Sequence, residues 1–368
     1  MGAPIEHPDD VARAFDNPAG TNGLAFVEFS SRDTALFTDL FSRLGFNEEA
    51  RHPTKHASLW KQAGITFLLN GEPDTHGGRF SALHGPCISR IAFRVADAQR
   101  AGRRALELGG AAYQNSEGLP VVTAGVVLAG IGGSLLELLD PSAEAALLAQ
   151  FEPVRAVRAE KTGDAGFLEI DHLTHNVHPG HLEQWADFYR RVFNFREVFY
   201  MDARGSRTGM RTRAMKSPCN KICIPVNEPT EPQSQIQEFI DQYHGEGVQH
   251  IALRSGDLNR SMQILKPRPL PTHVVPEAYY AAIDKRLPGH GQNVEELRRN
   301  GILLDGNRDP STGTWELLLQ VFSRNLFGPI FFEFIERRGN EGFGEGNAQA
   351  LFEALERDQM ERGVVAGP

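Results

Sequence analysis

The sequence predicts an α+β protein built from two tandem domains of βαβββ units. Three observations support this fold class. The 368 residues exceed what one hydrophobic core usually holds. Short strand-like segments alternate with amphipathic helical segments along the chain. The order of these segments in the first half returns in the second half, which indicates an internal duplication.

The first domain is expected to span residues 1–151, and about the first 20 of these residues are expected to form an irregular arm. Two of its segments have apolar residues at helical spacing, Thr34–Leu44 and Ala96–Leu108, and each is followed by a terminating glycine. Alternating or short apolar runs bounded by turn residues predict the strands Gly23–Ser30, His56–Trp60, Ile65–Asn70, Cys87–Val95, Val121–Leu128 and Ser134–Leu139.

Residues 152–166 are charged and contain few apolar side chains, so we expect a linker there, followed by a second domain over residues 167–368. In that domain, helical periodicity predicts helices at Leu182–Val192, Gln235–Tyr243 and Ser255–Leu265. Strands are expected at Leu168–Val177, Arg211–Met215, Lys221–Pro225, Val248–Arg254, Leu317–Phe322 and Ile330–Ile335. Asn347 can cap a final helix after the glycine-rich segment 339–346.

The repeat can be followed residue by residue. CISRIAFRV aligns with GVQHIALRS, which places Arg90 opposite His250, and GSLLELLD aligns with GPIFFEFIE, which places Glu137 opposite Glu333. GLAFVEF aligns roughly with IDHLTHN, which places Ala25 or a neighbouring residue opposite His172. The first half therefore keeps a carboxylate but lacks both histidines. This pattern predicts a catalytic second domain and a first domain that serves structure or oligomer formation.

Composition excludes several classes of protein. The net charge is −9 and no basic stripe is present, so nucleic acid is not an expected partner. The three cysteines, Cys87, Cys219 and Cys223, form neither a CxxC pair nor an even-numbered framework, which favours free thiols in a reducing compartment. The N-terminal residues are not those of a signal peptide, and the longest uncharged run is interrupted by glycines. We therefore expect a cytoplasmic protein with no membrane segment.

Three polar residues in apolar strands suggest a metal site. Glu333 lies inside FFEFI, and a carboxylate there is costly to bury unless a cation lies beside it. His172 and His250 occur in similar apolar frames, and two histidines with one carboxylate are the ligand set of a non-haem Fe(II) facial triad. His172 and His175 are three residues apart and point to opposite faces of a strand, so spacing alone allows either one as the ligand.

Several motifs occur in a fixed order: IDHLTHNV, GVQHIAL, SQIQEF, GILLDG, LLLQVF, FFEFIER and GFGEGN. In this order the chain resembles the 4-hydroxyphenylpyruvate dioxygenase family of the vicinal oxygen chelate superfamily, over essentially its whole length. The resemblance implies the vicinal oxygen chelate fold, in which paired βαβββ modules form open barrels of mixed strands with helices outside.

Carried onto this sequence, the resemblance implies Fe(II) bound by His172, His250 and Glu333. It implies polar catalytic or substrate-pocket residues at Asn227, Gln235, Gln249 and Gln320. It also implies substrate contacts at Thr212, Phe322, Phe331, Phe343, Asn347, Ala348 and Phe352.

Two residues depart from the family pattern. Thr212 stands where serine is usual, which keeps the hydroxyl. Ala348 stands where phenylalanine normally follows the GFGxGN motif, and an alanine there widens the pocket near the aromatic end of the substrate. The departure at Ala348 concerns the exact substrate and the binding of ring-bearing inhibitors, and leaves the metal site untouched.

The implied reaction converts 4-hydroxyphenylpyruvate and O₂ to homogentisate and CO₂ in tyrosine catabolism, so an aryl 2-oxo acid and O₂ are the expected partners. A related oxygenase such as 4-hydroxymandelate synthase is the alternative. A non-catalytic small-molecule binding protein is a further alternative, which the intact triad disfavours. A first domain without ligands suggests packing, so a homodimer or homotetramer is expected.

Overall fold

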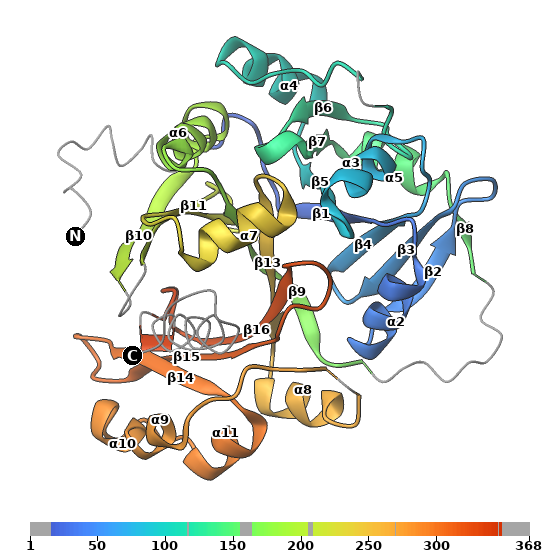
Figure 1. Cartoon of the computed structure of the whole chain (residues 1–368). Coiled ribbons are helices and arrows are strands. Elements are labelled where there is room, and N and C mark those ends of the chain that lie inside the picture. Colours follow the sequence, from blue (N-terminus) through green and yellow to red (C-terminus); the bar gives the residue numbers. More distant parts are fainter. Residues whose placement is uncertain are drawn as a thin grey trace.

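The computed structural model describes residues 16–115, 118–154, 164–204, 209–268, 270–344 and 346–347. Its two halves each contain an eight-stranded mixed sheet with helices on the outside (Figure 1). This is the α+β architecture that the sequence predicts. Within the described residues, no helix is long and apolar enough to cross a membrane.

The first sheet has the strand order β6-β7-β5-β1-β4-β3-β2-β8. Its strands are β1 (Leu24–Ser30), β2 (Asn47–Arg51), β3 (Ala57–Gln62), β4 (Ile65–Asn70), β5 (Cys87–Arg94), β6 (Val126–Ala129), β7 (Leu135–Leu139) and β8 (Glu152–Pro153). The α-helices of this half are α2 (Ala35–Arg43), α3 (His76–His84), α4 (Ala98–Glu107) and α5 (Pro141–Leu148), and a short 3₁₀ turn, η1, covers Ile131–Gly133.

The second sheet has the order β10-β11-β12-β9-β13-β16-β15-β14. Its strands are β9 (Phe167–Asn176), β10 (Arg196–Arg204), β11 (Gly209–Lys216), β12 (Cys223–Pro229), β13 (Gly247–Ser255), β14 (Leu303–Arg308), β15 (Trp315–Phe322) and β16 (Phe331–Arg338). The helices are α6 (His181–Phe193), α7 (Gln235–Tyr243), α8 (Leu258–Leu265), α9 (Glu277–Ala281), α10 (Ile283–Arg286) and α11 (Val294–Asn300). The sheet curves from β10 and β11 round to β15 and β14 (Figure 1).

The strand register supports the internal repeat. In the first half Ala92 on β5 lies between Phe26 on β1 and Glu137 on β7. In the second half Ala252 on β13 lies between His172 on β9 and Glu333 on β16 in the same way. Phe26, the neighbour of Ala25, therefore takes the place of His172. Strand β14 corresponds to a single bridge at Ala112 in the first half, so the second βαβββ unit of that half is reduced.

An arginine fills the centre of the first half, at the position that corresponds to His250. Arg90 is fully buried between two carboxylates: its Nε donates to Glu28 at 2.7 Å and its Nη1 to Glu137 at 2.7 Å. Its guanidinium carbon lies 4.9 Å from the centre of the Phe26 ring. A permanent side-chain cation thus compensates the buried carboxylates of this half.

The core of the protein continues between the two halves. Phe29 and Phe67 pack with their rings 4.8 Å apart, and each lies 6.5 Å from the ring of Phe332 on β16. Phe332 is fully buried, as is Phe334, which stacks on Phe167 at 5.1 Å. Because side chains alternate along a strand, these phenylalanines turn Glu333 to the opposite face of β16.

Most of the expected elements occur within a few residues of their predicted bounds, and α7 covers the predicted range. The expected strand over 121–128 is only partly present, since β6 begins at Val126. Helices α3, α5, α9, α10 and α11 and strands β2, β10 and β14 were not predicted, because their apolar periodicity is weak. The short strand β8 was not predicted either, and it takes the first two residues of the expected linker. The final helix, beyond Asn347, falls outside the described residues.

Candidate metal centre and substrate pocket

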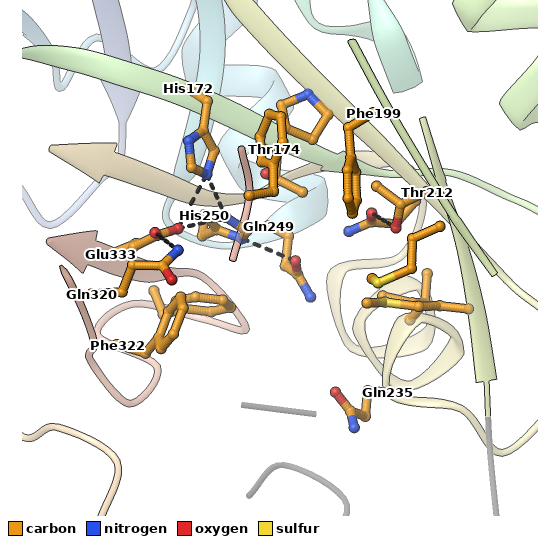
Figure 2. Close-up of a pocket in the computed structure, with 17 residues that line it drawn as sticks. His172, Thr174, Phe199, Thr212, Gln235, Gln249, His250, Gln320, Phe322 and Glu333 are labelled. Carbon is orange, nitrogen blue, oxygen red and sulfur yellow. Dashed lines mark hydrogen bonds and ion pairs between the residues drawn. The ribbon is translucent and has the colours of Figure 1, made fainter. Parts of the chain in front are cut away.

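Three neighbouring strands in the middle of the second sheet bring His172, His250 and Glu333 together (Figure 2). His172 and Glu333 flank Ala252, and His250 lies two residues before Ala252 on the same strand. All three residues are buried.

The donor atoms are spaced as a metal ion requires. The Nε2 atom of His172 lies 3.3 Å from the Nε2 atom of His250 and 3.1 Å from Oε2 of Glu333. The third distance, from His250 Nε2 to Glu333 Oε2, is 3.5 Å. Ligands about 2.0–2.2 Å from one ion and at right angles to each other lie ~3 Å apart. The three residues therefore fit one face of an octahedral metal ion.

Each candidate ligand has a polar partner that orients it. Asp171 Oδ1 lies 2.9 Å from Nδ1 of His172, and Gln249 Oε1 lies 3.1 Å from Nδ1 of His250. Gln320 donates from Nε2 to Glu333 Oε1 at 2.8 Å. A carboxylate can only accept, so the ring proton of His172 belongs on Nδ1 and its Nε2 faces the other two ligands. Such outer partners fix ring orientation and tautomer in metal sites.

The electrostatics also suit a cation. Burial raises the pKa of Glu333, but the neighbouring His172 and hydrogen bonds from both histidines outweigh it and hold the pKa at about 2. Burial lowers the pKa of His172, whereas Glu333 and Asp171 raise it to about 9. His250 has a lowered pKa, mainly because it is buried. A buried carboxylate that stays ionised between two imidazoles is a donor set for a divalent metal, which would replace the shared proton.

The triad forms one side of a pocket that holds about 700 Å³ of empty space, part of it open to solvent. Aromatic rings line the pocket next to the triad: Phe331 stacks on His250 at 4.7 Å, and Phe343 lies 5.6 Å from His172 and 5.1 Å from Phe199. Among the residues that the structure describes, the pocket is lined by His172, Thr174, Phe199, Met201, Met210, Thr212, Pro225, Asn227, Gln235, Ile236, Gln249, His250, Gln320, Phe322, Phe331, Glu333 and Phe343.

A second polar group lies across the pocket from the triad, where Figure 2 shows Thr212 and Gln235. Thr212 Oγ1 donates to Asn227 Oδ1 at 2.7 Å, and Asn227 Nδ2 donates to Asn176 Oδ1 at 3.1 Å. Gln235 is the first residue of α7. The pocket thus has a metal-ligating end, an aromatic middle and a neutral polar end.

The structure brings most of the sequence-predicted residues to this pocket. Thr212, Asn227, Gln235, Gln249 and Gln320 line it, together with Phe322, Phe331 and Phe343. Asn347 lies behind the pocket wall, where its Nδ2 donates to Gln320 Oε1 at 2.8 Å. Ala348 and Phe352 lie outside the described residues.

Gln249 and His175 lie close to the candidate ligands in the sequence, and of the two only Gln249 lines the pocket among the described residues. Strand alternation alone would turn Gln249 away from its neighbour His250, but the register between β13 and β9 shifts between Val248 and His250, and this bulge brings Gln249 to the pocket as well. His175 lies outside the cluster of donor atoms, and burial lowers its pKa to about 4.

Several site residues were missed by sequence reasoning. Phe199 and Met201 lie on β10, a strand that was not predicted. Arg337 lies near the end of β16, where an arginine is ordinarily solvated, but it is nearly buried in an ion pair with Asp171. Tyr279 was not singled out, yet its hydroxyl donates to Asn347 Oδ1 at 2.6 Å. The only sequence signal for the Arg337 ion pair was that Asp171 directly precedes a candidate ligand.

Comparison with known proteins agrees with this geometry. Residues 15–151 match the family model "Hydroxyphenylpyruvate dioxygenase, HPPD, N-terminal", and residues 169–282 match the Glyoxalase/Bleomycin resistance protein/Dioxygenase superfamily. The chain is 44% identical to hemolysin VllY of Vibrio vulnificus over 95% of its own length and 98% of that protein. It is 42% identical to 4-hydroxyphenylpyruvate dioxygenase of Pseudomonas aeruginosa, over 95% of this chain and 97% of that one.

Among solved structures, a triple mutant of 4-hydroxymandelate synthase from Streptomyces coelicolor matches with a TM-score of 0.78 and 25% identity. The match covers 94% of this chain and 100% of the other. The fold and the buried triad thus define an enzyme of the vicinal oxygen chelate superfamily whose site fits a metal ion. More narrowly, the chain belongs to the 4-hydroxyphenylpyruvate dioxygenase family.

Proposed function

We propose that the protein is an Fe(II)-dependent dioxygenase that converts 4-hydroxyphenylpyruvate and O₂ to homogentisate and CO₂, as a cytoplasmic enzyme of tyrosine catabolism. The observation that carries this proposal is the buried His172, His250 and Glu333 cluster at one end of an aromatic pocket, in a chain of this family.

Iron bound by the triad would bind the 2-oxo acid and activate O₂, and the electrons for the reduction of O₂ would come from oxidation of the substrate. Overall, one oxygen atom enters the new carboxylate, the other enters the ring, and the former carboxyl group leaves as CO₂. The chain itself prepares the donor atoms. Gln320 holds one oxygen of Glu333, so the other oxygen faces the two Nε2 atoms.

The remaining pocket residues would orient the substrate. Its 2-oxo acid would lie at the triad and its ring between Phe331 and Phe343, with the phenol toward Thr212 and Asn227. Amides and a hydroxyl can bind a phenol without introducing a charge that competes for the metal. Apolar walls also exclude water from the reacting end, which protects reactive species from side reactions.

Measurement of O₂ uptake by the Fe(II)-loaded protein with 4-hydroxyphenylpyruvate, with mass spectrometry of the product, tests this function. We expect uptake that depends on the substrate and is coupled to homogentisate. Uptake without any arylpyruvate contradicts the proposal. Tight binding of the arylpyruvate to the Fe(II)-loaded protein without O₂ uptake would instead identify a binding protein.

A second candidate is 4-hydroxymandelate synthesis, favoured by the match to a solved 4-hydroxymandelate synthase. It would use the same triad and substrate and hydroxylate a different carbon. The two products are isomers with different fragmentation, so fragment spectra of the same reaction mixture decide between them.

We further propose that the first half serves assembly into a homodimer or homotetramer, because Arg90 replaces the metal-binding arrangement there. Light scattering on the purified protein tests this. A single monomer mass would contradict it.

A further inference from the structure

Asp171 lies behind the metal centre and combines two interactions. Its Oδ1 accepts from Nδ1 of His172 at 2.9 Å. Both of its oxygens also accept from Arg337, Oδ2 from Nε at 2.7 Å and Oδ1 from Nη2 at 2.8 Å. The side chains of Asp171 and Arg337 are only 9% and 7% exposed. This is a bidentate ion pair of the kind that fixes both planar groups in one orientation.

The other side of the Arg337 guanidinium serves a different part of the site. Its Nη1 donates to the carbonyl oxygens of Asn340 at 3.1 Å and of Gly342 at 2.6 Å. The guanidinium carbon lies 5.9 Å from the ring of Phe343, the residue that follows Gly342. Phe343 in turn lines the substrate pocket and lies against His172. Arg337 therefore contacts both Asp171, which orients the candidate ligand His172, and the loop that carries Phe343 of the pocket wall.

We propose that Arg337 is a positioning residue that aligns the metal ligand His172, through Asp171, with the substrate wall at Phe343, through the carbonyls of Asn340 and Gly342. The inference rests on the proposed function of the site. Arg337 touches neither the candidate ligand atoms nor the pocket, and acts through these neighbours.

The geometry requires an arginine. The Arg337 side chain donates four hydrogen bonds, two to the Asp171 carboxylate and two to the loop carbonyls. A planar guanidinium with five N–H groups can satisfy these acceptors together. A lysine ammonium has three donors at a single point, so it can keep the charge beside Asp171 but cannot also hold both carbonyls.

Asp171 and Arg337 line a second, polar cavity together with other charged residues, among them Lys216 and Arg254, and these two have partners of their own. Lys216 is paired with Glu341 at 2.8 Å, and Arg254 with Glu169 at 2.8 Å. Neither pair contacts a candidate ligand in the part of the chain that the structure describes. Their presence does not replace the contact between Arg337 and Asp171.

The test compares R337M, R337K and the double variant D171N/R337M with the wild-type protein. The matched control is R338M, because Arg338 is the next residue, is more exposed, and pairs with Glu336 instead. The double variant removes both buried charges, so it keeps the experiment informative if R337M alone fails to fold. Co(II) serves as the metal probe, with its affinity measured by chelator competition and its ligand geometry by visible absorption.

For R337M and the double variant we expect Co(II) affinity to fall about 10–100-fold, the range found when partners of metal-binding histidines are removed. The visible spectrum of bound Co(II) should change with it. For R337K we expect affinity close to wild type but a raised KM for the arylpyruvate, because only the loop contacts are lost. R338M should match the wild type in every measurement.

Unchanged Co(II) affinity and spectrum in both R337M and the double variant, with at most a lower melting temperature, would overturn the inference and leave Arg337 a structural residue. If the wild-type protein itself binds no Co(II), the proposed function fails. If the wild type binds Co(II) but forms no homogentisate, the metal measurements still decide the role of Arg337. The two failures are therefore distinguishable.

Discussion

Replacing Gln320 with leucine should weaken metal binding while leaving the three ligands in place. Gln320 is buried and makes two hydrogen bonds of 2.8 Å, one to Glu333 Oε1 and one from Asn347 Nδ2. Leucine has a similar size and makes neither. The substitution therefore removes the Gln320 partner of one carboxylate oxygen, Glu333 Oε1, and of one amide donor, Asn347 Nδ2, in a buried environment.

The size of the effect follows from those two groups. Each buried polar group that loses its partner costs about 1–3 kcal/mol, so the free energy of unfolding of the metal-free protein should fall by ~2–6 kcal/mol. Loss of the partner that orients a metal-binding side chain typically reduces metal affinity about 10–100-fold. At about 1.4 kcal/mol for each factor of ten, this corresponds to ~1.4–2.8 kcal/mol of binding free energy.

Two assays measure these quantities. Urea unfolding of the metal-free protein gives the change in stability, and Fe(II) competition against a chromophoric chelator under anaerobic conditions gives the change in affinity. Q263L is the matched control, because Gln263 is an exposed residue of α8, away from the site. It should change neither value by more than a few tenths of a kcal/mol.

Equal metal affinity in Q320L and the wild type would refute this reasoning. It would mean that the carboxylate of Glu333 is held by its strand and by the metal alone, and that Gln320 serves only the substrate side of the pocket.

Three further outcomes are expected. R90M should destabilise the protein by ~3–5 kcal/mol in urea unfolding, because it leaves two buried carboxylates without their cation. The triple variant E28Q/R90M/E137Q should recover part of this loss. Unchanged stability in R90M would contradict the ion-pair assignment. F332A should lower the free energy of unfolding by ~3–5 kcal/mol through the cavity it creates. Fe(II) affinity in chelator competition should stay unchanged, because Phe332 faces away from Glu333. A parallel loss of affinity would contradict this and show that the two faces of β16 are coupled. Iodoacetamide at pH 8, followed by peptide mass mapping, should label Cys219 before Cys223. Burial alone would raise the pKa of Cys219, but hydrogen bonds from Ser217 and the backbone outweigh it and lower that pKa, whereas burial raises the pKa of Cys223 to about 12. Faster labelling of Cys223 would contradict this order.

The residue types of the triad and the duplication were predictable because both leave local signals, whereas the choice of His172 over His175 came from the family resemblance. A carboxylate inside an apolar strand is conspicuous, as Glu333 shows, and strand periodicity decides which of its neighbours face the core. The alignment of the two halves also placed Arg90 opposite His250, and the strand register agrees. These features depend on residue type and spacing along one strand, which the sequence states directly.

Other parts of the site depend on contacts between distant segments. Glu28 pairs with Arg90, and Asp171 pairs with Arg337 across 166 positions, and in neither pair does the sequence indicate which residue the partner is. Arg337 therefore looked like an exposed strand end. Gln249 reaches the pocket through a bulge, and periodicity alone cannot predict a shift in register.

The central claim is that His172, His250 and Glu333 together hold one iron ion. A crystal grown anaerobically with Fe(II), with diffraction data collected on both sides of the iron absorption edge, tests this most directly. The account predicts a single strong anomalous peak among His172 Nε2, His250 Nε2 and Glu333 Oε2, and its loss in E333A. A peak at another site, or no peak within bonding distance of the three side chains, would contradict the account.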